Sequence, residues 1–117
     1  MKQNTLYAQR IKEDIKFTLS RHQGRSKAIT NSVLANNIGV HDRYIQLMIR
    51  ELISDGVPIA SATDNPAGYF IINTWQEAEV YANSLKNRLI EDARRRRDFK
   101  RSCAMHLETA SQGKFFI

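Results

Sequence analysis

A strongly amphipathic helix predicted over residues 42–55 constrains the fold of this chain more than any other segment. Its apolar residues recur at spacings of three and four, and they are Ile45, Met48, Ile49, Leu52 and Ile53. This spacing places them on one side of an α-helix, so that side must pack against other parts of the chain. Arg43, Gln46 and Arg50 fall on the opposite side, and Gly56 ends the helix.

The neighbouring segments predict a shorter helix before this one and a β-hairpin after it. Thr30 is a suitable N-cap for a helix over residues 31–38, and Gly39 takes the following turn with positive φ. Two short apolar stretches, 57–61 and 68–72, flank a turn-rich segment and form the hairpin. Two helices joined by a sharp turn and followed by a hairpin can hold a helix out toward the major groove of DNA.

The expected core draws on each of these elements. Val33, Leu34 and Ile38 supply the buried side of the shorter helix, and Val40 packs between the two helices. An N-terminal amphipathic helix is predicted over residues 6–22. Its apolar stripe consists of Tyr7, Ile11, Ile15, Thr18 and Leu19. Gly24, in the basic loop that follows, is expected to be the residue that ends this helix.

A long helix is predicted to close the domain. Thr74 and Glu77 have the spacing of a capping box, and the helix should run to about Ala104 with an Arg-rich end. The fold class is therefore mainly α with a small β-hairpin. The chain divides into four parts. Residues 1–27 form an N-terminal helix and basic loop, and residues 28–73 form the two-helix and hairpin unit. Residues 74–104 form the long C-terminal helix, and residues 105–117 form a tail without clear period.

The charge of the chain favours a polyanionic partner. Its 117 residues carry a net charge of +6 and give a pI near 9.8. The charge is uneven: residues 1–29 hold seven basic and two acidic groups (+5), residues 30–74 two and four (−2), and residues 75–117 nine and six (+3). The positive charge is therefore concentrated beside the two-helix unit rather than on it.

Several other classes of protein find no support in the sequence. Cys103 is the only cysteine, which excludes an internal disulfide and fits a reducing cytoplasm. No secretory leader or membrane span is recognised. His22, His41 and His106 are scattered, and Cys103 with His106 supplies only half of a zinc site. We therefore expect no enzyme activity, no metal and no cofactor.

The polar side of the helix over residues 42–55 is the main candidate site. Arg43 and Arg50 suit bidentate contacts with guanine, and Gln46 suits adenine. An ordinary solvated helix surface is the alternative. Further candidates for DNA contact are Arg25 and Lys27 in the basic loop, Thr30, Asn31 and Ser32 at the start of the shorter helix, His41, Tyr44 and Leu47 around the longer helix, and Asn65 at the hairpin tip.

A basic run near the end of the long helix is a second candidate surface. It comprises Arg94, Arg95, Arg96, Arg97, Lys100 and Arg101. Four consecutive arginines cover all sides of a helix, so they cannot form one packed face. A solvated helix end near the favourable C-terminal dipole is one interpretation, and contact with a phosphate or an acidic partner is the other.

Three stretches carry a resemblance to a known family. They are residues 29–45 (ITNSVLANNIGVHDRYI), 51–59 (ELISDGVPI) and 65–71 (NPAGYFI). Together they resemble the winged helix-turn-helix domains of small bacteriophage and prophage proteins, which are related to the biotin-repressor-type DNA-binding domain. The segment 77–88 is similar to the helix that follows this domain in those proteins. The resemblance implies that residues 42–50 form the recognition helix and that the hairpin tip is the wing.

The resulting expectation is a cytoplasmic protein, in the bacterial host cytoplasm if phage-encoded, that binds double-stranded DNA as a regulator or replication factor. Homodimerisation through the C-terminal helix is compatible with Tyr81, Leu85 and Leu89 on one side of it. The alternative function is an adaptor or inhibitor that uses the same fold to bind a protein, which Tyr44, Leu47 and the acidic balance of residues 30–74 favour.

Overall fold

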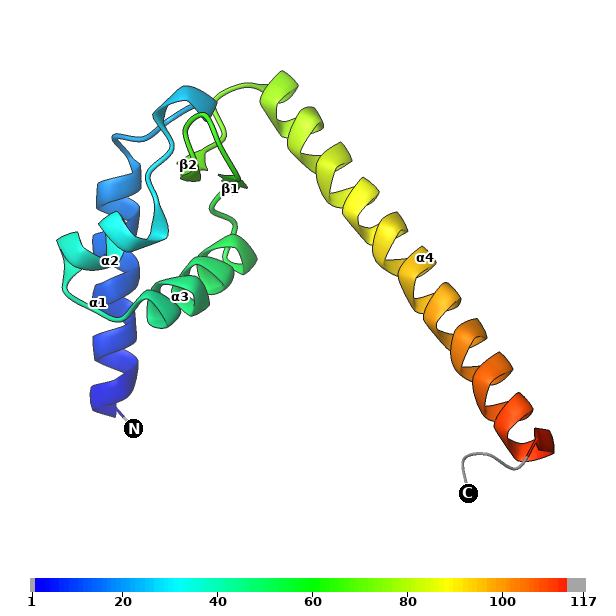
Figure 1. Ribbon diagram of the computed structural model, residues 1–117. Helices are drawn as coiled ribbons and strands as arrows, with labels where there is room; N and C mark the ends of the chain where they lie inside the picture. The colour runs from blue at the N-terminus through cyan, green and yellow to red at the C-terminus, as the bar shows by residue number, and fades with distance from the viewer. Residues whose placement is uncertain (1, 114–117) are drawn as a thin grey trace. The chain divides into compact units, whose positions relative to one another are not determined.

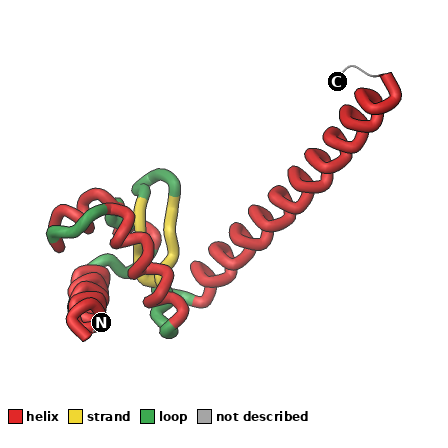
Figure 2. The backbone as a smooth tube through the Cα atoms, turned by 90° about the horizontal axis from the view of Figure 1, so that it is seen from below, coloured by secondary structure: helices red, strands yellow, loops and turns green. Residues whose placement is uncertain are grey.

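The computed structural model describes residues 2–113, with the side chains of residues 5–109. Along the chain lie α1 (Lys2–Leu19), a 3-10 turn η1 (Arg25–Lys27), α2 (Asn31–Ile38), α3 (Asp42–Ser54), β1 (Ile59–Ala62), β2 (Gly68–Ile71) and α4 (Trp75–Gly113) (Figure 1). The protein is mainly helical, with one antiparallel hairpin and a long C-terminal helix (Figure 2). Residues up to Glu79 form one compact unit, and residues from Val80 onward form another.

The core of the first unit lies where α1, α2 and α3 meet (Figure 1). Each helix contributes side chains with no accessible surface: Ile15 and Leu19 from α1, Leu34 from α2 and Ile45 from α3. Met48, Ile49 and Leu52 of the α3 stripe are also buried, as the spacing of the apolar residues predicted. Burial of such side chains is the main favourable contribution to folding.

Three apolar residues expected in the core lie largely outside it. Val33 is 47% exposed, because α2 has only two turns and turns Leu34 and Ala35 toward the core instead. Ile53 is also 47% exposed, since it follows Leu52 by about 100° around α3 and falls at the edge of the stripe. Tyr7 is 50% exposed near the start of α1.

The helix ends of the two-helix unit agree with the sequence. The Thr30 hydroxyl accepts a hydrogen bond from the Val33 backbone N–H at 3.2 Å, and Gly39 follows α2 in the left-handed conformation with φ 86°. Gly56, just beyond α3, has φ 106°. The prediction for Gly24 was wrong: α1 ends at Leu19, and Gly24 lies five residues further on.

Strand β2 is bonded on both of its edges. On one side it pairs antiparallel with β1, where Ile59 is opposite Ile71 and Ala60 is opposite Phe70. On the other side the Ile29 N–H donates to the Tyr69 carbonyl at 2.9 Å, and the Tyr69 N–H donates to the Ile29 carbonyl at 2.7 Å. Ile29, in the segment that leads into α2, therefore forms one isolated antiparallel bridge to β2 that ties the hairpin to this segment.

Gly68 is required by this pairing. A Cβ atom at this position would overlap the backbone carbonyl of Ile29, and φ is 124°, which side-chain-bearing residues rarely adopt. The glycine thus allows the two backbones to approach closely at the start of β2.

Helix α4 begins as predicted but ends later. The Thr74 hydroxyl accepts a hydrogen bond from the Glu77 N–H at 3.1 Å, which is half of the expected capping box. The helix continues to Gly113 rather than stopping near Ala104. Residues 105–112 lack an apolar period, but they include good helix formers and no proline, so the helix continues through them. Residues 114–117 of the expected tail lie outside the described part of the chain.

Candidate nucleic-acid interface

Helix α3 has two contrasting sides. Ile45 is fully buried and Ile49 is 4% exposed, whereas Arg43, Gln46 and Arg50 are all exposed. Within residues 5–109, neither arginine forms an ion pair with an acidic side chain. The two guanidinium groups and the amide are therefore available on a helix whose other side is anchored in the core.

The other candidates around α3 differ in their surroundings. His41 is exposed, and its Nδ1 accepts a hydrogen bond from the Arg43 N–H at 3.1 Å, so it caps the helix. Tyr44 is partly buried against the core, with its ring centroid 5.8 Å from that of Tyr7 on α1. Tyr44 thus packs α3 onto α1. Leu47 is 46% exposed, on the open side of the helix.

The polar residues at the start of α2 bind other parts of the protein. The Asn31 amide donates to the Asp42 carbonyl at 3.1 Å, and the Ser32 hydroxyl donates to the Asp42 carboxylate at 3.3 Å. With the Thr30 cap, these contacts hold the N-terminal turns of α2 and α3 together. The buried Asn31 Oδ1 has no hydrogen-bond partner within the described residues.

Arg25 braces the hairpin tip. Its guanidinium donates to the Pro66 carbonyl at 2.7 Å and to the Asp64 carbonyl, and lies 3.9 Å from the Asp64 carboxylate. Its side chain is therefore engaged within the protein, which is a structural role that sequence reasoning missed. Lys27, two residues along, is exposed, as is Asn65 at the tip itself.

Glu77 joins the segment that contains Arg25 to the start of α4. Its carboxylate accepts hydrogen bonds from the backbone N–H groups of Arg25 at 2.9 Å and Asn73 at 2.8 Å. These hydrogen bonds hold the pKa of Glu77 below its usual value, and the bond from Arg25 makes the largest contribution. The capping-box spacing identified Glu77 as a helix-start residue, but nothing in the sequence linked it to Arg25.

Cations from the N-terminal segment offset the acidic groups near α3. The Lys12 ammonium on α1 lies 2.7 Å from the Asp55 carboxylate and 3.5 Å from that of Glu51. The hydrogen bond to Asp55 raises the pKa of Lys12. With Arg25 beside Asp64, three of the four acidic residues in segment 30–74 face a basic side chain. The negative balance counted along the sequence is therefore largely cancelled in space.

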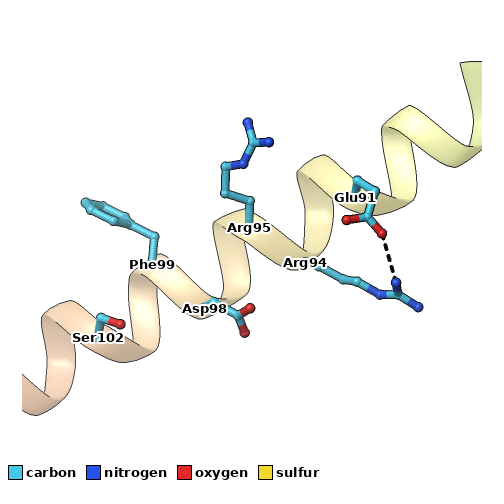
Figure 3. A pocket seen from close by; sticks show the side chains of 6 residues that line it. All are labelled: Glu91, Arg94, Arg95, Asp98, Phe99 and Ser102. Carbon is cyan, nitrogen blue, oxygen red and sulfur yellow. Dashed lines mark hydrogen bonds and ion pairs between the residues drawn. The ribbon is translucent and has the colours of Figure 1, made fainter.

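The arginine run lies in the middle of α4 rather than at its end. The expected interaction with a C-terminal helix dipole does not apply, because the helix continues to Gly113 and the dipole acts only over the last turn. Acidic neighbours pair with several of these side chains: Glu91 with Arg94 at 2.9 Å (Figure 3), Asp92 with Arg95 at 3.8 Å, and Asp98 with Arg97 and Arg101 at 3.3 and 3.4 Å. Arg96 and Lys100 have no such partner among the described side chains.

Metal centres and membrane spans find no support in residues 2–113. Among these described residues, no cluster of three or more His, Cys, Asp or Glu side chains is arranged to hold a metal ion. None of the helices in that part of the chain combines the length and apolarity that crossing a bilayer requires. Comparison of the chain with protein-family models, with curated proteins and with solved structures gave no match in any of the three.

Proposed function

We propose that the protein binds double-stranded DNA as a winged helix-turn-helix protein, with α3 as the recognition helix and the β1–β2 hairpin as the wing. The order of the elements supports this proposal, since two helices at a sharp turn are followed by a hairpin. The backbone pairing of Ile29 with Tyr69 adds further support, because it fastens the hairpin beside the helix pair.

The observation that carries the proposal is the open polar side of α3. Arg43, Gln46 and Arg50 are spaced by three and four residues, so they share one side of the helix and can reach successive base pairs. All three are exposed, and neither arginine is neutralised by an acid within the described residues. Lys27 lies in the loop before α2 and supplies a candidate phosphate contact.

The charge arrangement supports a strong phosphate contribution. Lys12 and Arg25 offset acidic groups that would otherwise repel a polyanion near α3. Affinity should therefore fall steeply as salt rises, because each phosphate contact releases counterions. The resemblance to phage and prophage proteins makes transcription regulation or replication in a bacterial host cytoplasm the corresponding biological role.

Fluorescence anisotropy with random-sequence duplex across a salt series tests the proposal. We expect a dissociation constant of about 1 µM or below at low salt, weakening steeply with added salt. The double variant R43A/R50A should bind at least about tenfold more weakly. The control R10A/K16A removes the same two charges from exposed positions on α1 and should lose much less. Equal losses for the two variants would contradict a specific role for α3.

One observation favours the alternative, an adaptor or inhibitor that binds a protein. Leu47 is 46% exposed on the same side of α3 as Gln46, and an exposed leucine among polar residues can supply apolar contact area in a protein interface. If the duplex is not bound even at low salt, DNA binding is excluded and the protein-binding function takes its place.

A further inference from the structure

Helix α4 carries one continuous heptad stripe through the arginine run. Positions 82, 85, 89, 92, 96, 99 and 103 alternate in steps of three and four, which keeps them within about 60° of one line along the helix. The residues at these positions are Ala82, Leu85, Leu89, Asp92, Arg96, Phe99 and Cys103. In heptad terms, Leu85, Asp92 and Phe99 take the d position and the others take a.

The apolar members of this stripe are open to solvent in the second unit. Leu89 is 70% exposed, Phe99 is 67% exposed and Leu85 is 44% exposed. Figure 3 shows Phe99 and Arg95 extending from the same side of α4, away from the Glu91–Arg94 pair. A helix of 39 residues with large apolar side chains at a and d positions has the pattern of one strand of a coiled coil.

Two charged residues occupy the middle of the stripe and have opposite signs. Asp92 is at d and Arg96 is at the next a position. Arg96 is also the one member of the four-arginine run that lacks an acidic partner among the described side chains. A charge at an a position destabilises a coiled coil unless the partner helix provides a countercharge, so these residues select the partner.

We propose that α4 pairs with α4 of a second copy of this chain as an antiparallel coiled coil centred on residue 94. In that register Asp92 lies opposite Arg96 of the second copy, and by symmetry Arg96 lies opposite its Asp92. Leu89 then packs against the second Phe99, and Leu85 against the second Cys103. Each layer joins an a position to a d position, as antiparallel packing requires. The inference is independent of DNA binding.

The parallel arrangement is disfavoured by the same two residues. In a parallel pair in register, Asp92 would face Asp92 and Arg96 would face Arg96, which places like charges in the seam twice. Antiparallel pairing turns the same side chains into two attractive contacts. The stripe is thus self-complementary in one direction only.

The charged residues that flank the heptad stripe determine how the dimer responds to salt. Lys86, Arg88, Arg95 and Lys100 occupy the flanking e and g positions. Two such helices repel each other at low ionic strength, and added salt screens this repulsion. Dimerisation should therefore strengthen as salt rises, in the opposite sense to DNA binding. The two activities can be distinguished in the same titration.

Cys103, the only cysteine, serves as a probe of the direction. In the antiparallel dimer the two copies of Cys103 are about 27 Å apart, so oxidised glutathione should not cross-link the natural protein. In the L85C variant each introduced thiol lies opposite the second copy's Cys103, and a covalent dimer should form. In L85C/C103S the two introduced thiols are as far apart as the two copies of Cys103 in the natural protein, so this variant should not cross-link. N87C, with its thiol at the f position on the far side of α4, should cross-link about tenfold less than L85C.

Charge exchange tests the register independently. D92R places arginine opposite arginine, so analytical ultracentrifugation should give a dimer dissociation constant raised by about tenfold or more. The double variant D92R/R96D restores both contacts and should return to within about threefold of the natural protein. E91R makes the same charge change beside the stripe and serves as the control. Circular dichroism checks that each variant keeps its helix content.

Three results would overturn the proposal. The first is a protein that remains monomeric at every accessible concentration and salt, which would show that no second copy covers the stripe. The second is efficient cross-linking of the natural protein or of L85C/C103S, which would show parallel pairing. The third is a D92R/R96D double variant that dimerises no better than D92R, which would remove the Asp92–Arg96 contact.

Discussion

The Lys12 ammonium lies 2.7 Å from a carboxylate oxygen of Asp55, and this contact joins the middle of α1 to the C-terminal end of α3. The pair positions the candidate recognition helix on its supporting helix. It also offsets negative charge close to the surface proposed to meet DNA. A residue that reads as an ordinary surface lysine in the sequence therefore contributes to both packing and electrostatics.

Replacing Lys12 should reduce stability in a pH-dependent way. The pKa of Lys12 is raised in the folded protein, chiefly by its hydrogen bond to Asp55. Its contribution is then fully present below the ordinary value of 10.5 and is lost as pH rises through the folded pKa. Urea unfolding should show K12M less stable than the natural protein at pH 8, with a smaller difference above pH 11. K16M, which removes an exposed lysine from the same helix, should show little change at either pH.

Replacing Glu77 should affect stability in the opposite pH range. Hydrogen bonds from the Arg25 and Asn73 N–H groups lower the pKa of Glu77. This stabilisation is present above the ordinary value of 4.5 and is lost as pH falls through the folded pKa. E77Q should be less stable than the natural protein at pH 7, and the difference should shrink as the pH falls below 4.5 and through the folded pKa of Glu77. E79Q, at an exposed position on the same turn, should match the natural protein throughout.

Gly68 should tolerate alanine less well than Gly39. At Gly39 the φ of 86° is the only obstacle, because no other atom lies within 4 Å of an added Cβ, so G39A should cost about 1 kcal/mol. At Gly68 the Cβ would also overlap the Ile29 backbone, so G68A should cost about 3 kcal/mol or more. Chemical denaturation of the two variants provides the measurement. Similar losses would mean that the close approach of β2 to Ile29 contributes nothing.

The two sides of α3 should respond differently to the same truncation. Ile45 is fully buried, so I45A should lose about 3 kcal/mol of unfolding free energy. Leu47 is 46% exposed, and L47A should change the free energy by only about 0.5 kcal/mol. Duplex binding by L47A then reports on the exposed side without loss of the fold. A large stability loss in L47A would contradict the orientation of α3.

Features that depend on neighbours in sequence were predictable. Local spacing and backbone chemistry account for the Thr30 cap, the left-handed glycine at position 39 and the α3 stripe except Ile53. The start of helix α4 follows from its capping residues. Its end was predicted too early, because the apolar period stops near residue 104 whereas helix propensity continues to favour the helix beyond it.

Features that depend on contacts across the chain were not predictable from spacing. Arg25 was expected to be a free basic group, yet it holds a loop about forty residues away. Tyr44 was a candidate for DNA contact, but its ring packs near Tyr7. The acidic balance of residues 30–74 argued against a polyanionic partner until the positions of Lys12 and Arg25 were known. Charge counted along a sequence carries no information about which groups face each other.

Arg25 uses its two chemically distinct parts for two different neighbours. Its side chain holds the carbonyl groups of Asp64 and Pro66, whereas its backbone N–H holds Glu77. Any amino acid except proline keeps the backbone bond, but only a planar guanidinium can span two carbonyl oxygens in this way. Substitution at position 25 can therefore release the turn between the strands while the backbone bond to Glu77, at the start of α4, is kept. One mutation thus separates two contacts that the same residue makes in the natural protein.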